Sequence, residues 1–167
     1  MMSSVKPSAP RKKITLERTF DASIEEVWDL WTTKDGIESW WGPDGFATKV
    51  SRIDLRPGGA LVYSFTAIAP DQIAFLKNAG MPLTQTITAS YTEVVPPRRL
   101  AYSSLADFMP GVEPYDVMTA VDMIAGPSGV RVVLTLDAMH DEHWSKLMVM
   151  GWENELGKLA RVLASRR

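Results

Sequence analysis

The chain has 167 residues, 46% of them apolar, which predicts a compact globular protein with a hydrophobic core. A net charge of −2 argues against the basic face that nucleic-acid binding needs, and the absence of cysteine excludes disulfides, a thiolate nucleophile and Cys-ligated zinc. No apolar run approaches the ~18 residues of a membrane span. The N-terminus lacks the apolar segment of a secretory signal. We therefore expect a cytoplasmic protein with no membrane span and no nucleic-acid partner.

In chain order, residues 1–12 are predicted to be a disordered tail and residues 13–167 a single domain. Residues 13–20 alternate between apolar and polar and predict a strand. Ser23, followed three residues later by Glu26, forms a capping box that begins a short helix. A second short helix is predicted before the turn at Gly42-Pro43, over residues 34–40.

The middle of the chain is dominated by strands separated by turn residues. The predicted strands are residues 46–55, 60–66, 84–95, 99–105, 115–125 and 130–137. A loop is predicted at residues 106–114. Between the strands at 60–66 and 84–95, Pro70-Asp71 and several apolar residues predict an inserted helix over 71–79. We expect this insertion to be a mobile cap beside the mouth of a pocket.

The last long run of the chain predicts one helix of about 24 residues, roughly 36 Å long. Its bounds are 141–164, and one broad face carries Trp144, Leu147, Met148, Gly151, Trp152, Leu159 and Val162. A stripe this wide needs a partner surface of equal length, and the preceding strands are the only candidate. Strands joined by short turns form an antiparallel meander with one covered face. The expected fold is α+β, with a curved antiparallel sheet wrapped around the helix and a cavity between them.

Five short motifs occur in an order that resembles a known family. They are Arg18-Thr-Phe-Asp-Ala-Ser-Ile-Glu-Glu-Val-Trp28, Trp40-Trp41-Gly42, Asp54-Leu-Arg-Pro-Gly-Gly59, Tyr91-Thr-Glu-Val-Val-Pro-Pro-Arg-Arg-Leu100 and Gly151-Trp152. Each motif alone is weak, but together they resemble the family of activator-of-heat-shock-protein-90-ATPase homologues. That family belongs to the START-related, birch-pollen-allergen-like SRPBCC superfamily. The resemblance runs from about residue 14 to residue 163.

The resemblance implies a helix-grip fold with a deep apolar pocket. It leaves function open, because this fold hosts lipid carriers, hormone receptors, aromatase/cyclase enzymes and co-chaperones. The segment 67–82 departs from the short hairpin that is usual in the family.

Ten residues are predicted to contact a ligand between helix and sheet, because ligand pockets are mostly apolar with a few placed polar groups. They are Trp40, Trp41, Tyr63, Phe65, Tyr102, Met123, Trp144, Met148, Trp152 and Glu155. The alternative for each aromatic residue or methionine is that it fills a dry core.

Glu155 gives the most specific prediction of the ten, since it projects from the apolar face of the predicted helix. A carboxylate in such a place must be paired, protonated or solvated by a cavity. It is expected either to contact a ligand amine or hydroxyl or act as a general acid/base, or to pair with an arginine from the sheet. A helix rolled so that Glu155 is exposed is a further alternative. Arg99 and Arg131 are the candidate partners, and the paired version is slightly favoured.

Other residues with chemical potential fit structural roles. His140 and His143 flank Asp141-Glu142, but Asp141 as a helix N-cap explains that cluster without a metal. There is no phosphate loop, nucleophile elbow or HExxH motif, so no catalytic residue, metal or cofactor is predicted. Gly151 costs about 1 kcal/mol in mid-helix. It is expected either to open space for a ligand or to let a strand approach closely.

The first functional hypothesis is a non-catalytic protein that binds a small apolar molecule, a lipid or an aromatic compound, in the grip cavity. The second is a module that regulates a chaperone ATPase, as the name of the family suggests. A cyclase or aromatase activity is a weaker third hypothesis. A homodimer is compatible with each of them.

Overall fold

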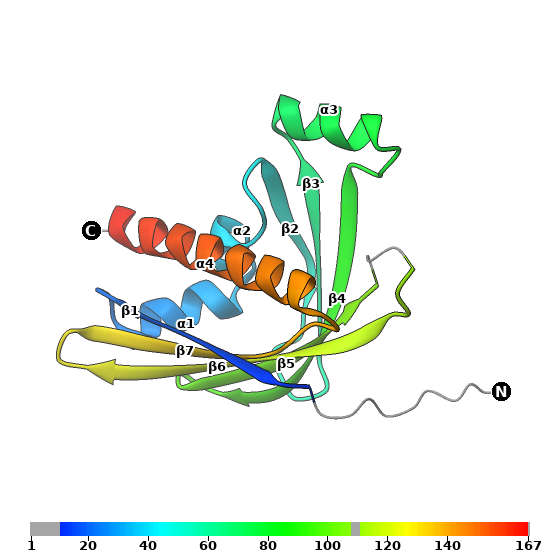
Figure 1. The fold of residues 1–167 in the computed structure, drawn as a ribbon. Helices are drawn as coiled ribbons and strands as arrows, with labels where there is room; N and C mark the ends of the chain where they lie inside the picture. The colour runs from blue at the N-terminus through cyan, green and yellow to red at the C-terminus, as the bar shows by residue number, and fades with distance from the viewer. Residues whose placement is uncertain (1–10, 108–110, 167) are drawn as a thin grey trace.

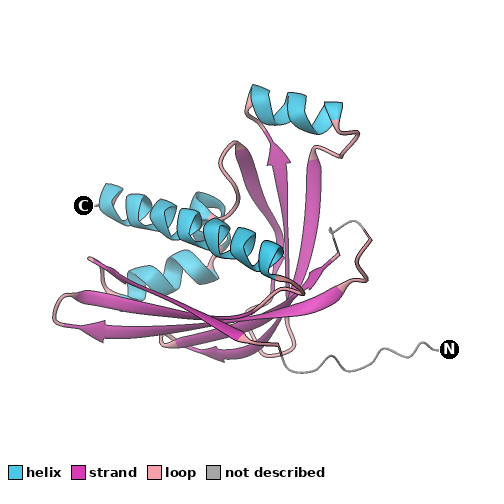
Figure 2. Cartoon of the chain, in the orientation of Figure 1, coloured by secondary structure: helices cyan, strands magenta, loops and turns pink. Residues whose placement is uncertain are grey.

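The computed structural model describes residues 11–107 and 111–166, which form one seven-stranded sheet and four helices (Figures 1 and 2). Residues 1–10 of the predicted tail and 108–110 of the predicted loop lie outside the described residues. In chain order the elements are β1 (Lys13–Phe20), α1 (Ile24–Thr32), α2 (Lys34–Trp40), β2 (Phe46–Ile53), β3 (Ala60–Ala67), α3 (Pro70–Asn78), β4 (Thr84–Val95), β5 (Arg99–Ala106), β6 (Tyr115–Gly126), β7 (Gly129–Asp137) and α4 (Glu142–Ser165).

The sheet is an antiparallel meander with the strand order β1-β7-β6-β5-β4-β3-β2. Helices α1 and α2 carry the chain from the β1 edge to the β2 edge, while every later strand pairs with its predecessor in sequence. Figure 1 shows the sheet bending strongly, with α4 lying across its concave side. The predicted α+β helix-grip fold is confirmed.

The short helices begin where the sequence predicts. The Ser23 hydroxyl accepts a hydrogen bond from the Glu26 amide at 3.2 Å, and the Glu26 carboxylate accepts one from the Ser23 amide at 3.0 Å. This reciprocal pair satisfies two amides that the first turn of α1 would otherwise leave unbonded. Thr33 then caps α2 through its hydroxyl, which accepts a hydrogen bond from the Gly36 amide. The predicted capping box is confirmed.

Alternation along the strands gives the sheet a buried inner face and a polar outer face. Leu61 and Tyr63 on β3, and Leu100 and Tyr102 on β5, are buried toward α4. Arg99, the residue before Leu100, points outward, where its guanidinium binds Glu93 on β4 and Asp122 on β6. A side chain's position along its strand therefore decides which face of the sheet it reaches.

Helix α4 is packed differently along its length. Its fully buried residues all lie in the C-terminal half: Leu156, Leu159 and Leu163. In the N-terminal half, Trp144, Met148 and Trp152 are only partly buried, and Leu147 is 44% exposed. The prediction of one continuous buried stripe is therefore wrong for Leu147. The strongly curved sheet contacts the helix closely at one end and leaves a hollow at the other.

An aromatic cluster fastens the helices to one another. The Trp31 ring on α1 meets Trp40 on α2 edge to face at 4.7 Å and stacks against Trp152 on α4 at 6.2 Å. The Trp40 indole N–H donates to the Leu30 carbonyl at 2.8 Å, so this fully buried ring has its polar atom satisfied. Such pairs add specific geometry to a large burial of apolar area.

The inserted helix is confirmed, one residue earlier than predicted at each end. Figure 1 shows α3 standing beyond the ends of β3 and β4. Leu76 is its only buried residue, and Phe75 is 64% exposed. The amides of Ile68 and Ala69 donate to the Gly45 carbonyl, which ties the start of the insertion to the loop before β2.

We predict that replacing residues 68–82 by a short turn leaves a protein that still unfolds cooperatively. The reason is that α3 adds little to the core, while β3 and β4 remain paired as far as Thr66 and Thr84. Thermal unfolding followed by far-ultraviolet circular dichroism tests this. Loss of the cooperative transition would show that the insertion is part of the core.

Truncation at two leucines tests the uneven packing of α4. Leu159→Ala is expected to lower the free energy of unfolding by about 2–5 kcal/mol, because a fully buried leucine leaves a cavity when it is shortened. Leu147→Ala, on the same helix but half exposed, should cost about 1 kcal/mol or less. Urea unfolding of both variants measures the difference. Equal costs would contradict the described burial.

Candidate ligand-binding cavity

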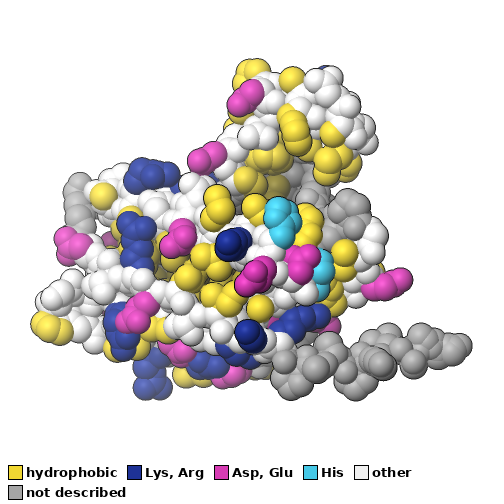
Figure 3. All heavy atoms as spheres, viewed as in Figure 1, with side chains coloured by type: hydrophobic (Ala, Val, Ile, Leu, Met, Phe, Trp, Pro, Cys, Tyr) yellow, Lys and Arg dark blue, Asp and Glu magenta, His cyan; other side chains and the backbone are white. Residues whose placement is uncertain are grey.

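The hollow under the N-terminal half of α4 is a cavity of about 430 Å³. Its lining residues come from the sheet, from the loop after α2 and from α4: Trp41, Pro43, Tyr63, Phe65, Gln85, Ile87, Tyr102, Ser104, Leu105, Ala106, Val117, Thr119, Met139, Trp144, Leu147, Met148, Gly151, Trp152 and Glu155. Its size lies within the ~300–1,000 Å³ of small-molecule sites. In Figure 3 hydrophobic side chains gather on the face below α3 and around α4.

Aromatic rings form the inner wall. Trp41 meets Tyr63 edge to face at 5.1 Å and lies 6.0 Å from Tyr102, and Tyr63 lies 5.4 Å from Phe65. The Trp41 indole nitrogen is buried and has no hydrogen-bond partner among the described side chains and backbone. These rings are positioned by alternate residues on β3 and β5 and by the end of α2. The wall is therefore rigid and rich in π faces.

Helix α4 forms the opposite wall, with Trp144, Met148, Gly151 and Trp152 following the helical repeat. A Cβ atom built on Gly151 meets no atom within 4 Å. The predicted alternative that Gly151 lets a strand approach closely is therefore wrong. The other alternative, that Gly151 opens space for a ligand, stays a prediction.

The structure brings eight of the ten predicted ligand residues to this one cavity: Trp41, Tyr63, Phe65, Tyr102, Trp144, Met148, Trp152 and Glu155. The other two do not line it. Trp40 is fully buried beside Trp31. Met123 is only 2% exposed and lies further along β6 than Val117 and Thr119, which do line the cavity. Whether the eight residues bind a ligand stays a prediction.

Several cavity residues were not predicted. Ile87, Ser104, Val117 and Thr119 are examples, and all lie on strands that also contribute buried residues. Residues two apart on a strand share a face. Because Tyr102 on β5 was predicted to face the cavity, Ser104 could have been predicted there too. Pro43 and Met139 lie outside the strands, and no periodicity marks them.

Glu155 enters the cavity from α4 and is held by the backbone of Gly42. The Gly42 amide donates to Glu155 Oε1 at 3.1 Å, and Lys158, one turn further along α4, donates from Nζ to the Gly42 carbonyl at 2.7 Å. Gly42 has φ of +103°, and a Cβ there would come within 2.6 Å of the Thr48 hydroxyl. Glycine is therefore required at this contact.

The predicted pairing of Glu155 with an arginine of the sheet is wrong. Arg99 binds Glu93 and Asp122, and Arg131 binds Glu17. Both arginines alternate with buried residues and so point to the outer face, away from α4. Residues on the outer face of the sheet cannot reach Glu155. Its hydrogen-bond partner is instead the Gly42 amide, in the loop before β2.

Burial raises the pKa of Glu155 from its ordinary value of 4.5 to about 7. The hydrogen bond from Gly42 and then the charge of Lys158 oppose this rise, but they do not cancel it. Tyr63 and Tyr102, which face the same carboxyl, have raised pKa values because they too are buried. Near neutral pH, Glu155 therefore exists in both its protonated and its ionised form.

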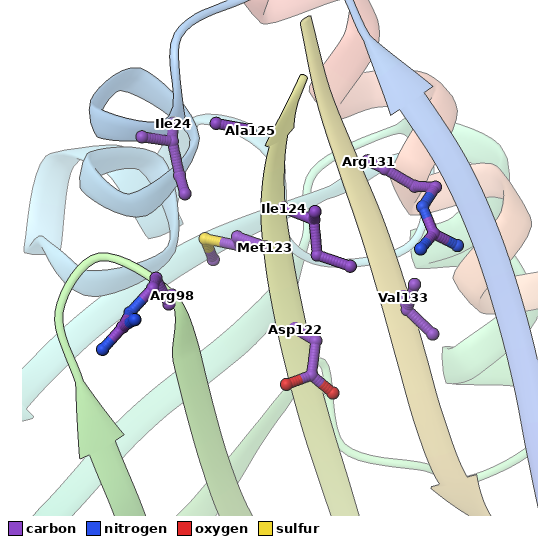
Figure 4. A pocket seen from close by; sticks show the side chains of 8 residues that line it. All are labelled: Ile24, Arg98, Asp122, Met123, Ile124, Ala125, Arg131 and Val133. Carbon is purple, nitrogen blue, oxygen red and sulfur yellow. The ribbon is translucent and has the colours of Figure 1, made fainter.

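A second depression, of about 560 Å³ and more open to solvent, is lined mainly by β6 and β7 (Figure 4). Asp122 and Ile124 of β6 and Arg131 and Val133 of β7 belong to its lining, and Arg98 reaches it from the turn before β5. Arg131 is engaged with Glu17, and Asp122 with Arg99. Apart from the buried Met123, its described walls are side chains that are at least partly exposed on the surface.

The remaining candidate chemistry is structural in character. The His140 ring nitrogen Nδ1 lies 2.8 Å from the Tyr115 hydroxyl, and Asp141 caps α4 by accepting from the Trp144 amide at 2.8 Å. Among residues 11–107 and 111–166, no group of three or more His, Cys, Asp or Glu side chains is placed to hold a metal ion. Within the same residues, no helix is long and apolar enough to span a membrane.

We predict that Glu155→Gln changes the pH dependence of stability. Because the pKa is raised on folding, the native state keeps a proton that the unfolded state releases, so stability falls as pH rises from about 4.5 to about 7. Gln removes this fall and should stabilise the protein above neutral pH by up to about 3 kcal/mol. Urea unfolding across this range measures it. Glu153→Gln, an exposed position on α4, is the control, and identical profiles for the two variants would contradict the burial of Glu155.

The fold agrees with comparisons to known proteins. The family model described as "Activator of Hsp90 ATPase homolog 1-like protein" matches residues 21–164. No curated protein matches the chain.

Several solved structures share the fold. Protein CV1439 of Chromobacterium violaceum is 24% identical, with 90% of this chain and 96% of that chain covered and a TM-score of 0.74. The AHSA1-like protein of Aeromonas hydrophila is 24% identical, with 93% and 94% covered and a TM-score of 0.71. The AHSA1 protein of Silicibacter pomeroyi is 19% identical, with 93% and 100% covered and a TM-score of 0.72. The chain therefore belongs to the family of activator-of-Hsp90-ATPase-homolog-1-like proteins, within the SRPBCC superfamily.

Proposed function

We propose that this protein binds a small, largely apolar molecule in the cavity between the sheet and the N-terminal half of α4. The observation that carries the proposal is the uneven packing of that helix. Its C-terminal half is buried by the core, while its N-terminal half presents Trp144, Met148 and Trp152 to an open space. Large apolar side chains left partly exposed around a hollow are typical of a ligand site.

The wall chemistry supports this function. Aromatic rings supply rigid contact area, and methionine adapts to ligands of different shape. The polar groups are few: Glu155, Ser104, Thr119 and Gln85 stand among otherwise apolar or aromatic residues. A few convergent polar groups in an apolar pocket orient a ligand without binding water strongly.

Two other activities are compatible with the sequence. Regulation of a chaperone ATPase is supported by the description of the family alone, and no feature of the cavity favours it. A cyclase or aromatase reaction would need a set of groups acting on one substrate atom. Glu155 is a carboxyl with a pKa suited to proton transfer, but a nucleophile or second acid–base partner is not paired with it among the described residues. We therefore propose binding without catalysis.

Substitutions at Gly151 test the proposal. Gly151→Phe should lower the affinity for the uncharged dye N-phenylnaphthylamine by tenfold or more, because the added ring takes up space at a position that lines the cavity. Dye fluorescence, together with quenching of the tryptophans in the wall, measures binding. Unchanged affinity in Gly151→Phe would place the dye elsewhere on the protein.

Gly151→Ala is the matched control. It should raise the free energy of unfolding by about 0.5–1 kcal/mol through helix propensity, since its methyl group meets no atom. Its dye affinity should stay close to that of the wild type. Absence of dye binding in the wild type would remove the proposed function.

A further inference from the structure

We propose that the ligand carries a positive charge: an amine or quaternary ammonium group on an apolar body, with the cation lying against the aromatic wall beside Glu155. This inference rests on the proposed function and narrows its ligand class. Three features carry it: the ring of π faces, the unoccupied side of the Glu155 carboxyl, and the apolar space beyond them.

The first feature is the arrangement of rings around the carboxyl. Trp41, Tyr63, Phe65 and Tyr102 contact one another from the sheet side, and Trp152 faces them from α4. The face of an aromatic ring is electron-rich and attracts a cation most strongly where water is excluded. Tryptophan is the strongest of these rings in this respect, and Trp41, Trp144 and Trp152 line the same cavity as Glu155. Neutral apolar ligands gain nothing from this property.

The second feature is the incomplete pairing of Glu155. Oε1 accepts from the Gly42 amide, whereas Oε2 has no hydrogen-bond partner among the described residues. Lys158 does not bind the carboxylate directly, because its ammonium donates to the Gly42 carbonyl. The charged and titratable groups that act on this carboxyl are Lys158 from α4, Tyr63 from β3 and Tyr102 from β5. The two tyrosines are neutral, so a ligand cation meets one carboxylate and one lysine whose ammonium is already engaged.

The third feature is the space beyond the carboxyl. Met148, Leu147, Ile87 and Val117 continue the cavity lining as apolar surface. A cation of small volume therefore has room for an attached aromatic or aliphatic body. A metal ion or an inorganic cation would leave this apolar wall unused and would find one carboxylate as its ligand, which is fewer than such ions need.

Binding of such a cation is linked to the proton on Glu155. The ionised carboxylate attracts the cation, while the protonated form does not, so binding must release a proton when the pH is below the pKa of this group. Affinity for a permanently charged ligand should rise with pH and level off above about 7. Affinity for an uncharged ligand of the same shape should not rise.

The experiment uses two probes of matched shape with the full-length protein. One is phenylpropyl-trimethylammonium, and the other is its uncharged isostere, in which tert-butyl replaces trimethylammonium. Tryptophan quenching gives the dissociation constant of each across a series of pH values on both sides of neutrality. We expect the cation to bind at least tenfold more tightly than the isostere at alkaline pH, and to lose most of this advantage at acid pH, where only the attraction to the aromatic rings remains.

Two variants assign the effect to Glu155. In Glu155→Gln, the pH dependence should disappear and the affinity for the cation at alkaline pH should fall tenfold or more, while the isostere binds as before. Glu153→Gln removes an equal charge from an exposed position on the same helix and should change neither probe. The binding of the isostere also reports that the cavity of Glu155→Gln is intact.

The outcomes separate this inference from the proposed function. If the isostere binds as tightly as the cation at alkaline pH, or if Glu155→Gln keeps the preference for the cation, the charge recognition is wrong while the apolar site stands. If neither probe binds and N-phenylnaphthylamine also fails, both the inference and the proposed function are overturned. The wild-type pH series needs no variant, so it decides the question even if Glu155→Gln fails to fold.

Discussion

The contact on which the rest of the site depends is the one between α4 and the backbone of Gly42. Glu155 accepts from the Gly42 amide and Lys158 donates to the Gly42 carbonyl, so one turn of helix holds the two peptide groups that flank this one residue. This fixes the rotation of α4 about its axis and its position along the sheet. It also places a carboxyl where an apolar residue would otherwise complete the core. The requirement for glycine follows from the same contact, since Thr48 and Phe65 leave no room for a side chain.

That contact divides α4 into two parts with different tasks. On its C-terminal side, leucines pack into the core and provide stability. On its N-terminal side, the sheet curves away and the same helical face borders a cavity. Regions with fewer buried contacts open more readily than the core, which suits the half of the helix that would admit a ligand. Burying Glu155 at this junction is unfavourable for its ionised form, which is why its pKa is raised. Stacking between Trp31 and Trp152 stabilises the junction between the two halves of the helix.

Much of the fold could be predicted because its determinants are local. The threonine-rich segment that ends before Pro96-Pro97 predicted both bounds of β4, and Ser23 with Glu26 marked the start of α1. The helical repeat placed Trp144, Met148, Trp152 and Glu155 on one face, and all four line the cavity. The wrong predictions concern residues whose surroundings are formed by segments far away in the sequence. Leu147 is exposed because the sheet curves away, and the partner of Glu155 is a backbone amide 113 residues away that no side-chain pattern marks. Arg99 could have been excluded, since it alternates with buried Leu100 and Tyr102.

The central claim is that the Glu155 carboxyl lies inside the cavity that we propose as the ligand site. The most direct measurement is the titration of its side-chain carboxyl carbon by NMR in protein labelled at glutamate, with and without N-phenylnaphthylamine. The structure predicts a midpoint near 7 in the free protein. An uncharged ligand would remove further water from the carboxyl and shift the midpoint higher. A midpoint close to 4.5, unchanged by a bound dye, would contradict the account.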